Sequence, residues 1–150
     1  MSITYSFDQD QGLIFARVTG ELNIALTEDY FARLQQDEDC PEKAIEIVDF
    51  SGVSDFAIQY GEMSTITNQY QRTKSTKDIQ ATVFNCTSDL SYGIGRMLQT
   101  LHELVNKKHV VIITRSQEEL TRCIEELRAN PPDTGDSHSL APDPPRCAAR

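Results

Sequence analysis

Tryptophan is absent from this 150-residue chain, and aromatic residues make up only 7% of it. No stretch approaches the roughly 18 consecutive apolar residues of a membrane-spanning helix, so membrane insertion is not expected. The first residues have neither the basic start nor the apolar run of a signal peptide. The four cysteines are far apart, which excludes the C-x-x-C spacing of zinc and redox sites. These absences predict a cytoplasmic protein with free thiols.

Positive charge is also scarce. The chain has 14 Lys and Arg residues against 23 Asp and Glu residues, which gives a net charge of −9. A surface of this sign repels the phosphates of nucleic acids and anionic lipids, so neither is an expected partner.

Apolar segments of two kinds alternate along the chain. Short segments rich in β-branched residues predict five strands, and the first two form an antiparallel hairpin because only a short polar turn separates them. Amphipathic segments predict about four helices, and those between later strands make parallel crossovers. The fold class is therefore α/β, a mixed and mostly parallel five-stranded sheet with an antiparallel N-terminal edge hairpin. The expected strands are residues 2–7, 13–20, 44–50, 79–85 and 109–114, and the expected helices are 27–36, 61–72, 89–105 and 117–128. Thr27 is the expected N-cap of the first helix, and Ser116 with Glu119 forms the expected capping box of the last.

The composition changes at residue 130. Residues 130–150 hold five of the six prolines and little apolar bulk. Such a segment cannot bury enough surface to offset its ordering entropy. We expect one domain at residues 1–129 and a disordered tail at residues 130–150.

Two glycines stand inside the predicted helix 89–105, in the segment SDLSYGIGRM. Each glycine costs a helix about 1 kcal/mol relative to alanine. Helical spacing predicts that Gly93 lies at the edge of the core face, where it allows close packing, and that Gly95 has an accessible backbone. The residues predicted to form this core face are Leu90, Ile94, Met97, Leu98, Leu101, Leu104 and Val105.

The opposite face of this helix is predicted to carry Tyr92, Arg96, Gln99 and Glu103. Tyr92 and Arg96 are four residues apart and able to stack on each other. Beside a bare glycine backbone they predict a contact patch, although a plain solvated face fits the same pattern. Asp49, Asp55 and Asp89 lie near the C-terminal ends of predicted parallel strands, at the edge where open α/β sheets bind ligands. We assign no metal to them, because a helix N-cap accounts for Asp89. The candidate partner-binding or ligand-binding residues are Ser54, Asp55, Asp89, Tyr92, Gly95 and Arg96.

Two segments resemble the bacterial SpoIIAA-like family within the wider group of STAS domains. VDFSGVSDF is similar to the D-x-S-x-V motif through Asp49, Ser51 and Val53, and SDLSYGIGRM is similar through Asp89 to Met97. The resemblance covers roughly residues 3 to 128. It implies a small regulatory or ligand-binding module with a mixed sheet and four helices, and it does not imply an enzyme.

In anti-sigma-factor antagonists of this group, a Ser or Thr at the start of the following helix is phosphorylated. The matching position falls at residues 57–59, which are Ala, Ile and Gln and have no hydroxyl group. Ser54 and Ser64 flank this position without fitting the motif, so the phosphorylation switch is not carried over. Relatives also resemble the CRAL-TRIO lipid carriers in topology, which implies an apolar pocket near residues 51–61.

Catalytic groups do not form a recognisable motif. Only three histidines are present, and Cys86 is the one thiol placed so that a helix N-terminus can activate it. An inert buried thiol is the alternative, and no cofactor is predicted.

Two functional hypotheses follow. The first is a non-catalytic regulatory module that binds a protein partner, or itself as a homodimer. The alternative is a carrier or sensor of a small apolar or lipid-like molecule.

Overall fold

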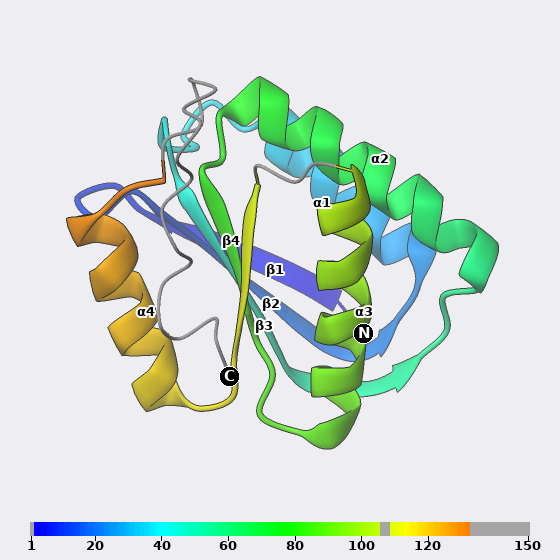
Figure 1. Ribbon diagram of the computed structural model, residues 1–150. Coiled ribbons are helices and arrows are strands. Elements are labelled where there is room, and N and C mark those ends of the chain that lie inside the picture. The colour runs from blue at the N-terminus through cyan, green and yellow to red at the C-terminus, as the bar shows by residue number, and fades with distance from the viewer. Residues whose placement is uncertain (1, 106–108, 133–150) are drawn as a thin grey trace.

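The computed structural model describes residues 2–105 and 109–132, and it confirms the predicted fold class (Figure 1). Five strands form one sheet in the order β1-β2-β3-β4-β5; β1 and β2 are antiparallel and the other neighbours are parallel. The strands are β1 (Ser2–Asp8), β2 (Leu13–Leu22), β3 (Ile45–Phe56), β4 (Ala81–Asn85) and β5 (Val110–Thr114). The helices are α1 (Ile24–Gln36), α2 (Tyr60–Lys77), α3 (Asp89–Val105) and α4 (Gln117–Ala129).

The helices divide unequally between the two faces of the sheet. Helices α1, α2 and α3 cover one face, and α4 lies on the other (Figure 1). Each face of the sheet therefore has its own hydrophobic core, and side chains alternate between the two cores along β3. Ile45 and Ile47 face α4, while Val48 and Phe50 face the other three helices. Among the described residues, no helix is long and apolar enough to cross a membrane.

Helix α2 is longer than predicted. Its expected end at Arg72 was wrong, because the helix continues through a segment rich in Ser and Thr to Lys77. The hydroxyl groups of Thr67, Thr73 and Thr76 each donate to the carbonyl four residues earlier, so they are satisfied within the helix. Asp78 then ends it in the left-handed conformation.

The other boundaries differ in smaller ways. Helix α1 begins at Ile24 with Asn23 as its N-cap, not at the predicted cap Thr27. Helix α4 has the predicted cap, since the Ser116 side chain accepts a hydrogen bond from the backbone N–H of Glu119. The predicted tail lies mostly outside the described residues, which end at residue 132.

Strand β3 extends six residues past its predicted end at Phe50. The segment from Ser51 to Phe56, which the sequence predicts as a loop, pairs with the last residues of β2 across two register shifts. A Cβ atom on Gly52 would lie 2.9 Å from the carbonyl oxygen of Val18, so only glycine fits this irregular pairing. Asp49 lies where the shift begins and forms an ion pair of 3.4 Å with Arg17.

Helix α3 is rotated relative to its predicted orientation. Of the residues predicted to form its core face, Leu90, Met97, Leu104 and Val105 are exposed, so this part of the prediction was wrong. The buried positions are shifted by one residue along the chain, which is a rotation of about 100°. The buried residues are Ser91, Ile94, Gly95, Leu98, Gln99 and His102.

The two glycines of α3 therefore have the opposite roles to those predicted. Gly95 is the closely packed one: a Cβ atom on it would lie 2.7 Å from Sγ of Cys86, a buried residue at the end of β4. Gly93 is exposed, and a Cβ atom on it would meet nothing within 4 Å. Gly95 thus brings α3 close to the sheet.

The contrast between the two glycines gives a paired prediction. Gly93→Ala is expected to stabilise the fold by about 0.5–1 kcal/mol, because alanine restricts the unfolded chain and the site has room. Gly95→Ala is expected to destabilise it by about 1–3 kcal/mol, because the added methyl overlaps the Cys86 thiol. Urea unfolding of both variants measures these changes.

The control is a double-mutant cycle with Cys86→Ala, which removes the overlapping sulfur. In that background Gly95→Ala is expected to lose most of its cost. Equal effects of Gly93→Ala and Gly95→Ala would contradict the assigned packing.

Candidate functional site

The predicted stacking of Arg96 on Tyr92 is not present. The guanidinium group over the Tyr92 ring belongs to Arg115, in the loop between β5 and α4, and its Cζ lies 4.4 Å from the ring centre. Arg115 also lies 3.3 Å from Asp89 in an ion pair. Asp89, Tyr92 and Arg115 therefore form one cluster at the N-terminal end of α3.

Arg96 is exposed and makes a separate contact. Its guanidinium donates to Oε1 of Gln99 at 2.7 Å, and Nε2 of Gln99 donates to the carbonyl of Val111 at 2.9 Å. Gln99 was predicted to lie on the outer face but is buried, and it holds α3 against β5. Gly95 is buried too, so the prediction that its backbone is accessible to a partner was wrong.

Ser54 and Asp55 are exposed on the extension of β3, a different element from α3. A carboxylate oxygen of Asp55 accepts from the backbone N–H of Phe56 at 2.8 Å. Their role as binding residues stays a prediction.

The rotation of α3 leaves an apolar surface that the sequence analysis assigned to the core. We call it the α3 outer strip: Leu90, Met97, Leu104 and Val105. Leu104 is 73% exposed and Val105 is 51% exposed. Four large apolar side chains thus lie along one side of one helix without cover from the described residues.

The aspartates and cysteines that the sequence offers for metal binding or catalysis do not form a site in the described part of the chain. Asp49 pairs with Arg17 and Asp89 pairs with Arg115. In residues 2–105 and 109–132, no cluster of His, Cys, Asp and Glu has the arrangement of a metal site. Cys86 is fully buried, and burial raises the pKa of its thiol to about 12, which favours the inert buried thiol over the activated one.

The larger core contains a polar network. Glu46, on the face of β3 toward α1, α2 and α3, accepts a hydrogen bond of 2.5 Å from the Tyr30 hydroxyl and one of 3.0 Å from Thr82. Tyr70 from α2 contacts Thr82 and Nε2 of His109 within hydrogen-bond reach. Burial raises the pKa of Glu46, and the two hydrogen bonds oppose part of this rise.

A second buried histidine, His102 on the inner face of α3, lies beside this network. Its ring centre is 4.2 Å from that of Tyr70, and only 2% of the residue is exposed. Burial lowers the pKa of His102 to about 4, so the imidazole is neutral at pH 7. Within the described chain its Nδ1 has no hydrogen-bond partner, which costs about 1–3 kcal/mol.

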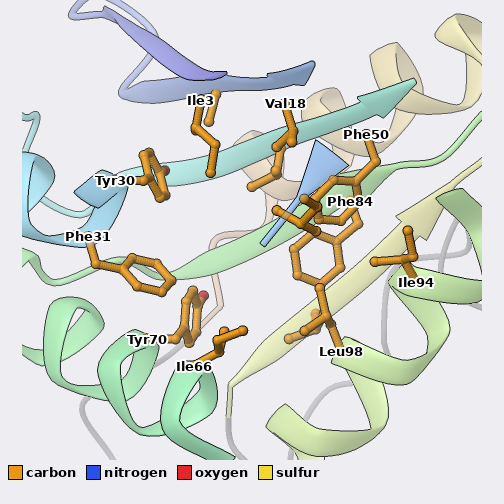
Figure 2. Packing of buried hydrophobic residues seen from close by; sticks show 14 of the residues in the cluster. Ile3, Val18, Tyr30, Phe31, Phe50, Ile66, Tyr70, Phe84, Ile94 and Leu98 are labelled. Atoms are coloured by element: carbon orange, nitrogen blue, oxygen red, sulfur yellow. The ribbon is translucent and has the colours of Figure 1, made fainter. Parts of the chain in front are cut away.

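An interior cavity of about 50 Å³ lies between the sheet and the three helices. Figure 2 shows the side chains of the strands and helices that converge on this region. All residues that line the cavity are buried, and Glu46, Tyr30, Tyr70 and His102 are among them. Ile58, from the segment predicted to border a pocket, also lines it.

The comparisons with known proteins bear on the fold. No family model matches the sequence, and the search of curated proteins finds no significant relative. Among solved structures, the chain matches the anti-sigma factor antagonist SpoIIAA in its unphosphorylated form with a TM-score of 0.51. The two are 13% identical, over 85% of this chain and 98% of SpoIIAA. The chain has the SpoIIAA-like fold.

A second match is an uncharacterized protein of the DUF3478 family from Shewanella loihica, whose structure is described as SpoIIAA-like. It has a TM-score of 0.46 and 8% identity, over 79% of this chain and 88% of that one. At 13% identity, the likeness to SpoIIAA extends to the fold alone.

In this SpoIIAA-like fold, the helix that follows β3 begins at Tyr60 with Gln59 as its N-cap. Ala57, Ile58 and Gln59 precede its first turn, and none of them has a hydroxyl group. Ser64 is exposed, but it lies within the helix and not at its start.

Sequence reasoning missed the polar network inside this SpoIIAA-like core. One signal was present, because Glu46 is a charged residue in the middle of the apolar segment AIEIVDF. Strand alternation places its side chain on the same face as Val48 and Phe50. The aromatic and histidine partners come from α1, α2 and the residue before β5, and no local spacing links them.

The buried His102 predicts a pH-dependent stability. Its pKa falls from 6.5 to about 4 on folding, so between these values the unfolded chain binds more protons than the folded protein. The unfolding free energy therefore decreases as the pH falls from about 6.5 to 4. His102→Phe is expected to remove this decrease. Its unfolding free energy relative to wild type should therefore rise by about 3 kcal/mol when the pH is lowered from 7 to 4.

The measurement is urea unfolding at half-unit steps of pH. Leu98→Ala, a nontitrating change one turn earlier on α3, is the control and should differ from wild type by a constant amount. A constant difference for His102→Phe as well would show that His102 titrates normally in the folded protein.

Proposed function

We propose that this protein is a non-catalytic regulatory module that binds a protein partner through the α3 outer strip. The observation that carries the proposal is the exposure of Leu90, Met97, Leu104 and Val105 on one helix. Contiguous exposed apolar patches on small soluble proteins mark interaction sites. An amphipathic helix with such spacing fits an apolar groove of a partner.

Polar residues beside the strip give it the composition of an interface. Arg96 is exposed next to Met97, and Asp89 with Arg115 lies at the N-terminal end of the helix. An apolar centre with a charged rim is the usual anatomy of a protein interface, and Tyr and Arg are common at its energetic centre. Asp89, Tyr92 and Arg96 therefore belong to the proposed surface, and buried Gly95 supports it from within.

The likeness to SpoIIAA agrees with this proposal, since that protein is named as an antagonist of an anti-sigma factor. The likeness is one of fold, so the α3 outer strip carries the proposal. Two partners fit the strip: a second copy of this chain, which makes a homodimer, or a different protein. The free thiols of Cys40 and Cys86 support a cytoplasmic location as part of the same proposal.

A second candidate function is the binding of a small apolar molecule. The cavity of about 50 Å³ among buried side chains favours it. An engineered cavity of about 150 Å³ binds benzene, so the space here suits a molecule smaller than benzene. The lipid-like ligand expected from the sequence does not fit this volume.

The partner surface is tested by Met97→Glu combined with Leu104→Glu. Both positions are exposed, so we expect the unfolding free energy to change by less than about 1 kcal/mol. Binding to the partner is expected to weaken at least tenfold, because the two introduced carboxylates would lose their hydration in the interface. Sedimentation velocity measures self-association, and photo-crosslinking from position 104 in cells captures a different partner.

Phe15→Glu is the matched control. Phe15 is an exposed aromatic residue on β2, outside the α3 outer strip. Its substitution and a crosslinker at position 15 should leave association unchanged. If the double variant sediments like wild type, and positions 104 and 15 give the same crosslinked species, the α3 outer strip is not a binding surface.

A further inference from the structure

The side of α3 that faces solvent alternates large and small residues. In chain order these are Leu90, Gly93, Met97, Thr100 and Leu104, and all five are exposed. The intervals between them are three, four, three and four residues, which is the spacing of the a and d positions of helices that pack side by side. The outer side of α3 therefore has the repeat of a helix–helix contact, with large residues at a and small residues at d.

Gly93 is a glycine that the fold of one copy does not require. A Cβ atom at this position would meet nothing within 4 Å, although glycine costs a helix about 1 kcal/mol relative to alanine. Glycine is useful in a helix where another group must approach the backbone closely. Since no group of the described chain approaches Gly93 on this side, such a group would come from another molecule.

The position of α3 leaves this side accessible. Helix α3 is the last of the three helices in its layer and lies beside β5, the edge strand of the sheet (Figure 1). Its inner face packs against β3, β5 and α2. The stretch from Leu90 to Leu104 is about 21 Å long at 1.5 Å per residue, so a partner helix of similar length matches it.

We propose that the partner of the α3 outer strip is a second copy of this chain, whose α3 packs antiparallel to the first so that Leu104 of each copy lies over Gly93 of the other. The proposal rests on the proposed function, in which the α3 outer strip is a binding surface, and it adds the identity and the orientation of the partner.

The shapes of the side chains favour the antiparallel orientation. When one of two paired helices runs backwards, the a positions of one face the d positions of the other, and each side chain fits between those of the facing helix. Leu104 then faces Gly93 of the second copy, and Met97 faces Thr100. The two-fold axis of the dimer repeats both contacts. A parallel pair would place Gly93 against Gly93 and leave a gap between the helices, which loses packing energy.

Charges beside the α3 outer strip select one register of this antiparallel pair. Arg96 and Glu103 are exposed and seven residues apart, so they lie on the same flank of the contact. With Leu104 over Gly93, Arg96 of each copy lies beside Glu103 of the other. A shift by seven residues in one direction brings Arg96 beside Arg96, and in the other direction Glu103 beside Glu103. Like charges in contact are unfavourable, so the register with two opposite-charge pairs is preferred.

The dimer is expected to be reversible. A contact limited to one helix from each copy buries less than the roughly 1,600 Å² of a standard interface, so dilution should dissociate it. Each copy also has a net charge of −9, which opposes association. Sedimentation velocity of the full chain in a dilution series at about 0.15 M salt is the measurement, because this salt screens charges more than about 8 Å apart.

Charge reversal tests the register. Arg96→Glu alone and Glu103→Arg alone each place like charges in two symmetric contacts, and each is expected to weaken the dimer at least tenfold. Combining both changes in one chain restores opposite charges and is expected to restore the affinity. An equimolar mixture of the two single variants is expected to form a mixed dimer more tightly than either variant pairs with itself, because its two contacts again join opposite charges.

The combined variant also controls for damage to the fold. Arg96 donates a hydrogen bond to Oε1 of Gln99, and Arg96→Glu removes it. The variant with Glu103→Arg in addition lacks the same hydrogen bond, so a folding defect cannot explain a restored affinity. Restoration therefore reports a contact between Arg96 of one copy and Glu103 of the other.

A change of shape tests the contact with Gly93. Gly93→Gln introduces a good helix former, so each copy should stay folded, but the new side chain takes the space of Leu104 of the second copy. The dimer is expected to weaken at least tenfold. Gly61→Gln is the matched control, because Gly61 is exposed on α2 and a Cβ atom there also meets nothing within 4 Å. It should leave the dimer unchanged.

The outcomes distinguish failure of this proposal from failure of the proposed function. A wild-type chain that stays monomeric at every concentration would overturn the second copy as partner, while crosslinking from position 104 tests the α3 outer strip separately. A dimer that Met97→Glu with Leu104→Glu weakens, but that ignores the charge reversals and Gly93→Gln, would overturn the antiparallel arrangement alone. A dimer unaffected by all these changes would overturn this proposal, and equal crosslinking from positions 104 and 15 would then overturn the proposed function too.

Discussion

The contact between Gly95 and Cys86 fixes how α3 lies on the sheet, and the candidate surfaces depend on it. Because Gly95 has no side chain, α3 approaches the end of β4 so closely that a methyl group would overlap the Cys86 sulfur. The hydrogen bond from Gln99 to Val111 holds the next turn of the helix against β5. Together these two contacts determine which face of α3 is turned toward the sheet.

That rotation opposes the apolar pattern of α3. Burying Leu90, Met97 and Leu104 would remove more hydrocarbon from water than burying Ser91, Gly95 and Gln99 does. The helix nevertheless buries the small and polar residues, because they permit close approach and complete hydrogen bonds. The exposed apolar side chains of Leu90, Met97 and Leu104 are the consequence, and under the proposed function a protein partner covers them.

The same helix connects the two candidate functions. Leu98 and His102 lie on its inner face and line the cavity, while Met97 and Leu104 lie on its outer face. An occupant of the cavity therefore touches the element that carries the α3 outer strip. One rigid helix with a ligand on one side and a protein on the other is a physically simple arrangement for a sensor.

Sequence periodicity was sufficient to predict the fold class, but it did not predict which residues form the candidate sites. The strands, the antiparallel pairing of the first two and the N-cap at Ser116 follow from local patterns. The rotation of α3 did not, because the decisive contact joins Gly95 to a residue on β4, and helical spacing contains no information about that neighbour. Sequence spacing also gave no sign of the partners of Glu46. These come from α1 and β4 and, through Thr82, from α2 and the residue before β5.

The buried network around Glu46 also constrains the sheet. Glu46 lies opposite Thr82 in the register of β3 with β4, and a one-residue slip would turn its side chain toward the apolar layer under α4. There it would lose Tyr30 and Thr82, and an unpaired buried carboxyl group is strongly destabilising. A core of hydrocarbon alone would accept such a slip at lower cost. We interpret the network as the feature that sets a unique register, and the cavity beside it as space left where aromatic and polar side chains of fixed shape meet.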